Sequence, residues 1–308
     1  MIYVLGGANM DIYGISRSTI NLRDSNIGTV QTVHGGVARN VTESLARLGL
    51  PVKFMSAFGN DAFGKELMEH LESLNVDLSD SLVVDDEKTS TYLAVINDGD
   101  MYVAICDNQI IFKLTEKSID SYLKQITKDD ILVMDTNLSE EIISYVMKHV
   151  DARIFIDPLS IEKTEKIKDH LKNIYACKPN IYEAEAMVGK KIRTLEELCA
   201  AGDTLLAKGV CHVCISLGDK GMYYQNSDER YLVQITPQEM VNASGAGDAC
   251  MAGIVYGSYH NMSSKDMIEY AMTNAVLALQ SETTVNQQLN KELLEKKRST
   301  FKFEWRKL

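Results

Sequence analysis

The sequence predicts an α/β fold built on a parallel sheet, because short apolar segments alternate with amphipathic helical segments along much of the chain. Apolar runs that are each followed by a helical pattern are typical of such a sheet. The candidate strands are IYVL from Ile2, ILVMD from Ile131, RIFID from Arg153, IYACKPN from Ile174 and HVCISLG from His212.

The helical segments each carry one apolar stripe, which predicts that they cover the faces of the sheet. The clearest stripes are Val41, Leu45 and Leu48, closed by Gly49, and Phe63, Leu67, Leu71 and Leu74. Open α/β sheets bind ligands beyond the carboxyl ends of their strands. We therefore expect the functional residues at that edge, where polar residues end four strands: Asp135, Asp157, Asn180 and Ser216.

Two segments interrupt this alternation, and we expect them to form a small separate sheet. One of them, TSTYLAVINDGDMYVAICD, indicates two strands joined around Asp98 and Gly99. A few strands with one apolar face must pack on a ligand, on the main domain or on a second copy, so a lid that also forms a homodimer is expected. The expected main domain comprises residues 1–11, 33–86 and 113–308, and the expected lid comprises residues 12–32 and 87–112.

Composition excludes several classes of function. The chain has 308 residues with 32 Lys and Arg against 43 Asp and Glu, a net charge of −11, and it shows no basic stripe before KKR near its C-terminus, which disfavours a nucleic-acid partner. The longest apolar run, Met101 to Cys106, is far shorter than the roughly 18 residues of a spanning helix. With no charged region at the start of a signal peptide, a cytoplasmic protein without a membrane partner is expected.

The six cysteines are irregularly spaced and do not predict a disulfide scaffold. Cys211 and Cys214 form a C-x-x-C motif, but no second pair follows and the surrounding VCHVCISLG reads as a buried strand. Zinc or redox chemistry is therefore disfavoured.

The most informative motif is a run of small residues, Ser244 to Gly247, followed by Asp248 and a helical segment. Small residues let several amide N–H groups converge at a helix start, where a phosphate can bind. Asp248 has two interpretations. It can stabilise the helix N-terminus, or it can act as a general base that takes a proton from a hydroxyl attacking the bound phosphoryl group.

Two further motifs also admit two interpretations each. In KPNIYEAE, Asn180 and Glu183 can form a capping box, or their oxygens can hold waters around Mg²⁺. The clusters GGANMD from Gly6 and HGGVARN from His34 can be simple turns, or their glycines, amides and carboxylate can bind the hydroxyls of a ribose-like polyol.

Two other matches fail. The segment GNDAFGKE has the spacing of a P-loop, but Glu66 stands where Ser or Thr should bind Mg²⁺, so it reads as a turn entering a helix. The start VLGGANMD lacks the G-x-G-x-x-G of dinucleotide-binding proteins, which disfavours an NAD-dependent oxidoreductase.

Six segments, in order along the chain, resemble the signature segments of the PfkB/ribokinase family of carbohydrate kinases: GGANMDI, HGGVARN, GNDAFG, KPNIYEAEAMVG, SLGDKG and NASGAGDACMAG. The resemblance runs from residue 1 to about residue 286. It implies a ribokinase-like α/β/α three-layer sandwich with a small β-sheet lid, MgATP as phosphoryl donor, and phosphorylation of a primary hydroxyl on a sugar or nucleoside.

The resemblance also implies residue roles. Asp248 matches the catalytic base, and Gly245, Ala246 and Gly247 match the anion hole that stabilises the transferring phosphoryl group. Asn180 and Glu183 match the N-x-x-E motif that supports magnesium, through water, and phosphate. The substrate-hydroxyl contacts match Asn9, Asp11, Gly35, Gly36 and Asn40, and the nucleotide contacts match Ser216, Gly218 and Gly221, with Asn274 expected near adenine.

Finer features, including DSNIGTV, DTNLS and LALQSETTVN, resemble the pseudouridine kinases of this family. The chain departs from their pattern at Ile27, at Cys106 to Asn108 and at Gln287, and Asn242 replaces an aspartate that bears on a K⁺ site. The resemblance implies an ATP-dependent kinase for the 5′-hydroxyl of a ribosyl nucleoside, with pseudouridine first. The alternatives are a kinase for another nucleoside or for a free sugar such as ribose, and a nucleoside sensor without turnover.

Overall fold

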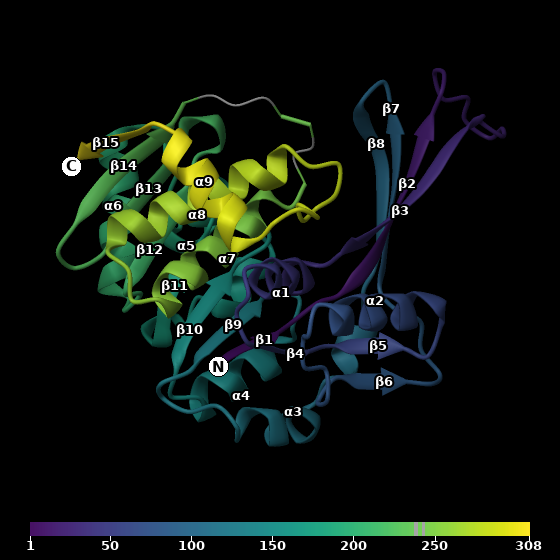
Figure 1. Ribbon diagram of the computed structural model, residues 1–308, viewed down its shortest axis with the longest axis horizontal. Coiled ribbons are helices and arrows are strands. Elements are labelled where there is room, and N and C mark those ends of the chain that lie inside the picture. Colours follow the sequence, from purple (N-terminus) through teal and green to yellow (C-terminus); the bar gives the residue numbers. More distant parts are fainter. Residues whose placement is uncertain (237–239, 242–243) are drawn as a thin grey trace.

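The computed structural model describes residues 1–308 apart from 237–239 and 242–243. Within the described residues a large mixed sheet forms the centre of the molecule (Figure 1). In spatial order its strands are β15 (Phe303–Lys307), β14 (Arg230–Ile235), β13 (Met222–Gln225), β12 (His212–Ser216), β11 (Ile174–Cys177), β10 (Arg153–Asp157), β9 (Ile131–Asp135), β1 (Ile2–Leu5) and β4 (Val52–Met55). The strands from β12 to β4 pair in parallel and those from β12 to β15 are antiparallel, so the predicted parallel sheet is confirmed.

The sheet is buried on both faces because successive strand residues point to opposite sides. In β1, Ile2 and Val4 join one apolar core, whereas Tyr3 and Leu5 join the other. The first core contains residues of α1 (Val37–Arg47), α2 (Ala62–Ser73), α7 (Ala246–Tyr259), α8 (Ser264–Leu279) and α9 (Lys291–Thr300). The second contains residues of α3 (Glu116–Leu123), α4 (Glu140–His149), α5 (Ile181–Val188) and α6 (Leu195–Ala207).

A second sheet, which we call the lid sheet, projects from this body (Figure 1). Its strands are, in spatial order, β3 (Gly28–Gly35), β2 (Asn9–Ser16), β7 (Thr91–Asn97) and β8 (Asp100–Asp107). Asp98 and Gly99, with φ of 53° and 85°, form the tight turn between β7 and β8. Because β2 begins at Asn9 and β3 ends at Gly35, each strand includes residues on both sides of a boundary expected between the main domain and the lid. A small parallel pair, β5 (Ala57–Gly59) with β6 (Leu82–Val84), lies beside the main sheet.

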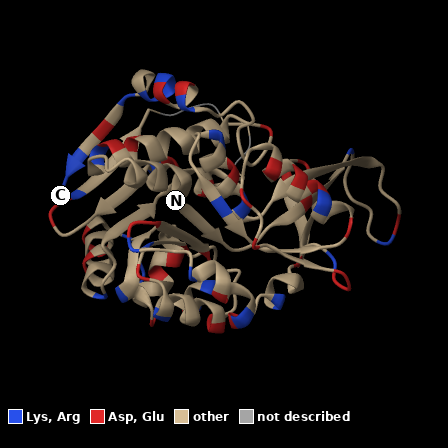
Figure 2. Ribbon diagram, turned by 60° about the horizontal axis from the view of Figure 1, so that its bottom comes forward, with Lys and Arg blue, Asp and Glu red and all other residues tan. Residues whose placement is uncertain are grey.

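The segment GNDAFGKE, which has the spacing of a P-loop, forms the turn into α2 that the sequence predicts. The Asp61 side chain accepts a hydrogen bond from the Gly64 amide at 2.8 Å, which caps the helix. Acidic and basic residues are interspersed over the molecule (Figure 2). In the part of the chain that the structure describes, no helix is long and apolar enough to cross a membrane.

Candidate active site

The N-terminus of α7 presents backbone N–H groups at the edge of the main sheet. Its N-cap, Gly245, has φ of 80°, and an added Cβ would overlap the carbonyl oxygen of Thr284, so only glycine fits here. An added Cβ at Gly247 would lie 3.4 Å from the Lys178 ammonium nitrogen. The helix start therefore combines first-turn amide groups with a nearby lysine, which is a favourable environment for a phosphate.

Lys178 is a functional candidate to which the sequence interpretation gave no role. It follows β11, is buried, and pairs with Asp157 at the end of β10, with 3.0 Å between Nζ and Oδ2. Burial alone lowers the pKa of Lys178, but the Asp157 carboxylate outweighs burial and raises it above its usual range. The lysine is therefore a permanent cation beside the anion site. The signal in the sequence that could have identified Lys178 is its position as a charged residue directly after a buried apolar strand.

Asp248 lies in the first turn of α7, half-buried, and accepts a hydrogen bond from the Asn40 side-chain amide at 2.6 Å. Burial and the nearby Asp157 raise the pKa of Asp248 to about 7, while the Asn40 hydrogen bond and Lys178 oppose that rise. A carboxylate whose pKa lies near neutrality is well matched to proton transfer from a hydroxyl.

The polar and glycine clusters near the N-terminus come together at the base of the lid sheet. Asn9 donates a hydrogen bond to Asp11, and the Tyr13 hydroxyl donates another at 3.2 Å. An added Cβ at Gly35 would overlap the Asp11 carboxylate. Burial raises the pKa of Asp11 to about 6. These groups form a compact polar cluster of the kind that can hydrogen-bond hydroxyls.

Gly36 connects this set to α1. Its φ is 95°, and an added Cβ would lie 2.6 Å from the Gly7 carbonyl oxygen, so a side chain is excluded. One turn later, Asn40 on α1 contacts Asp248. The structure thus brings the predicted substrate residues next to the predicted base.

The capping interpretation of the N-x-x-E motif is confirmed. The Asn180 side-chain oxygen accepts from the Tyr182 and Glu183 amides at 2.9 and 3.0 Å, and Glu183 Oε2 accepts from the Asn180 amide at 2.9 Å. Glu183 is buried, and burial raises its pKa. Among the described residues, no group of three or more His, Cys, Asp and Glu is arranged to hold a metal. The magnesium role of this motif stays a prediction.

The strand end predicted to contact nucleotide lies beside the motif. Ser216 and Asn180 form a parallel bridge, and the Ser216 amide donates to the Pro179 carbonyl at 2.9 Å. Gly218 and Gly221 have φ of 65° and 89°, which glycine adopts without strain. The loop after β12 is therefore held at the same edge as the start of α5.

Asn274 is buried in the contact between α8 and α7. The residue is 1% exposed, and its side-chain amide donates to the Ala249 carbonyl at 2.7 Å. Its expected place near adenine stays a prediction. The K⁺ prediction depends on Asn242, which lies outside the described residues.

The site combines a helix start suited to binding an anion, a carboxylate whose pKa lies near neutral pH, and a polar cluster suited to binding hydroxyls. On a mixed α/β sheet, this combination defines a phosphotransferase that acts on an alcohol group. The sequence pattern of the pfkB family carbohydrate kinases matches residues 1–291. The chain belongs to this family of sugar and nucleoside kinases, which confirms the resemblance found in the sequence.

The chain is also similar to individual proteins. It is 32% identical to pseudouridine kinase of Escherichia coli K12 over 292 residues, which cover 94% of this chain and 93% of that one. It is 22% identical to guanosine-inosine kinase of Exiguobacterium acetylicum, over 91% and 94% of the two chains.

Among solved structures, a putative sugar kinase from Clostridium perfringens superposes with a TM-score of 0.90 at 31% identity, covering 100% of this chain and 98% of that one. Ribokinase from Thermotoga maritima superposes with a TM-score of 0.86 at 20% identity, covering 97% of this chain and 99% of that one. These likenesses confirm the ribokinase-like fold.

Proposed function

We propose that the protein is an ATP-dependent kinase for the 5′-hydroxyl of a ribosyl nucleoside, with pseudouridine as the first substrate to consider. The observation that carries the proposal is the Asn40 to Asp248 hydrogen bond, which joins the hydroxyl-binding cluster to the anion-binding helix start. The similarity to E. coli pseudouridine kinase supports the choice of nucleoside.

On the donor side, the first-turn amides of α7 and the Lys178 ammonium stabilise the negative charge of a transferring phosphoryl group. Gly247 has no side chain between the helix start and the Lys178 ammonium, an arrangement that suits the terminal phosphate of ATP. Magnesium, when bound, neutralises phosphate charge. Asn180 and Glu183 would hold it through water, since their oxygens are the ligand type that it prefers.

On the acceptor side, Asn9 and Asp11 bind vicinal hydroxyls and fix the position of the sugar. Asp248 then takes the proton from the attacking hydroxyl. Because these residues are already connected through α1, the protein contributes mainly by positioning and electrostatics.

The lid sheet has two chemically different faces, and we propose that one contacts substrate and the other a second copy. Register places Asp11, Tyr92 and Cys106 on one face. The opposite face is apolar and open to solvent: Val30 and Ile105 are 74% and 64% exposed. It consists of Ile12, Val30, Leu93, Val95, Val103 and Ile105. A continuous exposed apolar patch is typical of an interface, here a homodimer through the lid.

The test is ATP-dependent phosphorylation of pseudouridine, uridine, inosine, cytidine and ribose, with and without Mg²⁺ and with K⁺ replaced by Na⁺. Strong preference for pseudouridine with a Mg²⁺ requirement is the expected result, and loss of activity in Na⁺ would support a K⁺ site. Better turnover of another compound would identify that compound as the preferred substrate. Saturable nucleoside binding without ATP consumption would contradict the kinase reaction.

A further inference from the structure

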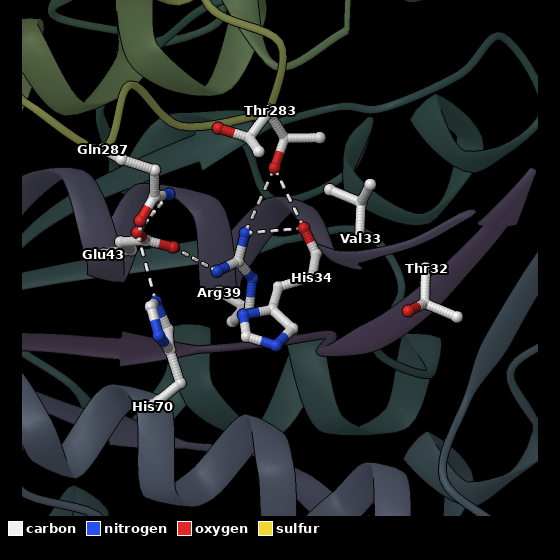
Figure 3. A pocket seen from close by; sticks show the side chains of 9 residues that line it. Thr32, Val33, His34, Arg39, Glu43, His70, Thr283 and Gln287 are labelled. Atoms are coloured by element: carbon white, nitrogen blue, oxygen red, sulfur yellow. Dashed lines mark hydrogen bonds and ion pairs between the residues drawn. The ribbon is translucent and has the colours of Figure 1, made fainter.

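Arg39 is among the largest fully buried side chains of the protein's described residues, and it lines a pocket of about 270 Å³ together with His34, Glu43, His70 and Gln287 (Figure 3). It donates from Nε to the Gly35 carbonyl at 3.0 Å and from Nη2 to the His34 carbonyl at 2.9 Å. The same Nη2 group donates to the Asn40 side-chain oxygen. The arginine therefore contacts both the glycine turn and the residue that holds Asp248.

These contacts fix the orientation of the Asn40 amide. A guanidinium has donors and no acceptor, so the amide atom that faces Arg39 must be the oxygen. The Thr284 hydroxyl, 3.1 Å from the same oxygen, can donate to it as well. The Asn40 amide nitrogen then points at Asp248, to which it donates at 2.6 Å. Without Arg39, the amide could turn and present its oxygen to the carboxylate, which is repulsive.

Arg39 itself is anchored by Glu43, one helical turn further along α1. Glu43 is 1% exposed and pairs with Arg39, with Arg47 at 2.7 Å and with His70 at 3.2 Å. Burial alone raises the pKa of Glu43, but the His70 hydrogen bond and the Arg39 charge bring it well below its usual value. Glu43 is thus a fixed anion that neutralises and orients the guanidinium.

Gln287 connects this anchor to the loop behind the anion site. Its side-chain nitrogen donates to Glu43 at 3.1 Å, and Arg47 donates to its backbone carbonyl at 2.7 Å. The loop also supplies Thr284, whose carbonyl contacts Gly245 at the start of α7. Gln287, one of the positions at which the chain departs from the pattern of the pseudouridine kinases, therefore links Glu43 to this loop.

We propose that Arg39 is a positioning residue for the phosphoryl transfer: anchored by Glu43, it holds the Asn40 amide in the single orientation that lets Asn40 donate to Asp248. This inference rests on the proposed role of Asp248 as the base. Arg39 acts through Asn40 and need not touch either substrate.

The charged groups near Asp248 determine which experiment can detect the effect of Arg39 on Asp248. Asp157, from β10, opposes ionisation of Asp248, whereas Lys178 and Arg39 favour it through their charge. Asp11, from β2, lies close enough to Arg39 to interact with it electrostatically. A test must therefore separate the charge of Arg39 from its hydrogen bonds. Arg39→Lys keeps the charge and removes the fork that reaches Glu43, His34 and Asn40 together.

We expect Arg39→Lys to lower kcat by about 10-fold and to raise the apparent pKa of the acid limb of the kcat profile by about one unit, with the KM for ATP changed less than about 3-fold. The matched control is Arg47→Lys, which loses a guanidinium that donates from Nε to Glu43 and from its two terminal nitrogens to Gln287, but has no contact with Asn40 among those described. It should leave the acid limb in place.

The inference is overturned if Arg39→Lys keeps the wild-type pH profile while Arg39→Met shifts it, because charge alone then explains the effect. An equal shift in Arg47→Lys would also overturn it. In an Asn40→Ala background, Arg39→Lys should have less than about a 2-fold further effect on kcat, since its route to Asp248 is gone.

If neither Arg39 variant folds by circular dichroism, Thr284→Val removes the other group that faces the Asn40 oxygen and should shift the acid limb in the same direction; an unchanged limb would contradict the proposal. Asp248→Asn in the same assays keeps the two proposals apart. If it retains activity, the role of Asp248 fails; if it is inactive while the Arg39 profile is unchanged, only the present inference fails.

Discussion

The residues at the start of α7 and those of the lid sheet differ in how the fold holds them. Lys178, Asp157 and Asp248 lie at the ends of buried strands or in the first turn of a helix, each paired with another polar group. The lid sheet exposes apolar side chains on one face. The groups that we propose for phosphoryl transfer are therefore fixed by the core, whereas the sheet that we propose for acceptor choice leaves one apolar face exposed.

The largest effect should come from the residues fixed by the core. Asp248→Asn removes the group that takes the proton but keeps the shape of the site, so kcat should fall by roughly 10²-fold or more while ATP affinity is preserved. Steady-state kinetics and calorimetric titration with ATP measure the two quantities. Activity within a few-fold of wild type would remove Asp248 from the mechanism.

Lys178→Met tests the cation at the anion site. We expect kcat/KM for ATP to fall by about 10-fold or more, because a buried positive charge near the phosphate is lost and Asp157 is left unpaired. Nucleoside affinity should change little. Lys208→Met, which removes an exposed lysine bonded to the Met187 carbonyl, is the control for loss of a lysine that lies away from the anion site. Equal losses in both variants would indicate a general structural effect.

The pH dependence should report mainly Asp248, with a smaller contribution from Asp11 at the start of the lid strand β2. Asp248 must be ionised to accept a proton, and its pKa is about 7, so kcat/KM should rise about tenfold per pH unit up to that value and level off above it. Asp11, with a pKa of about 6, should steepen the decline at lower pH. An activity flat from pH 5 to pH 8 would contradict this assignment.

A charge on the apolar face of the lid sheet should act on association and acceptor binding alone. Ile105→Glu is expected to shift the sedimentation profile toward the monomer and to raise the KM for nucleoside several-fold, with the KM for ATP unchanged. Val83→Glu, at an exposed valine on β6, is the control. A monomeric wild type, or an unchanged variant, would show that this face does not join two copies.

The smallest effect concerns stability. The pKa of Asp248 is raised in the fold, so its ionisation costs stability, and that cost grows as pH rises from about 4 through about 7. Asp248→Asn should therefore raise Tm at pH 8 by about 2 °C or more and leave it nearly unchanged at pH 4. Thermal melts at the two pH values measure the difference; a lower Tm at pH 8 would contradict it.

The sequence predicts the main sheet well because β1, β9, β10, β11 and β12 are short apolar runs whose burial needs no distant information. It does not predict β15, whose residues FEWRK are mostly polar and which forms only by pairing with β14, with Trp305 packed against Tyr231 at 5.2 Å. Motif spacing also places Asp248 correctly at a helix start.

Other parts of the site depend on contacts between residues far apart in the chain. Lys178 is paired with Asp157 on the neighbouring strand, and Asn40 contacts Asp248, 208 residues away. Asn274 matches a family position, yet only helix packing shows that its amide is occupied by Ala249.

Two strands of the lid sheet contain residues that we propose to bind the acceptor: Asn9 and Asp11 begin β2, and Gly35 ends β3 just before α1. Any rotation of that sheet carries these residues with it and alters their approach to Asp248. The lid sheet and the residues proposed to bind the acceptor are therefore continuous in the chain.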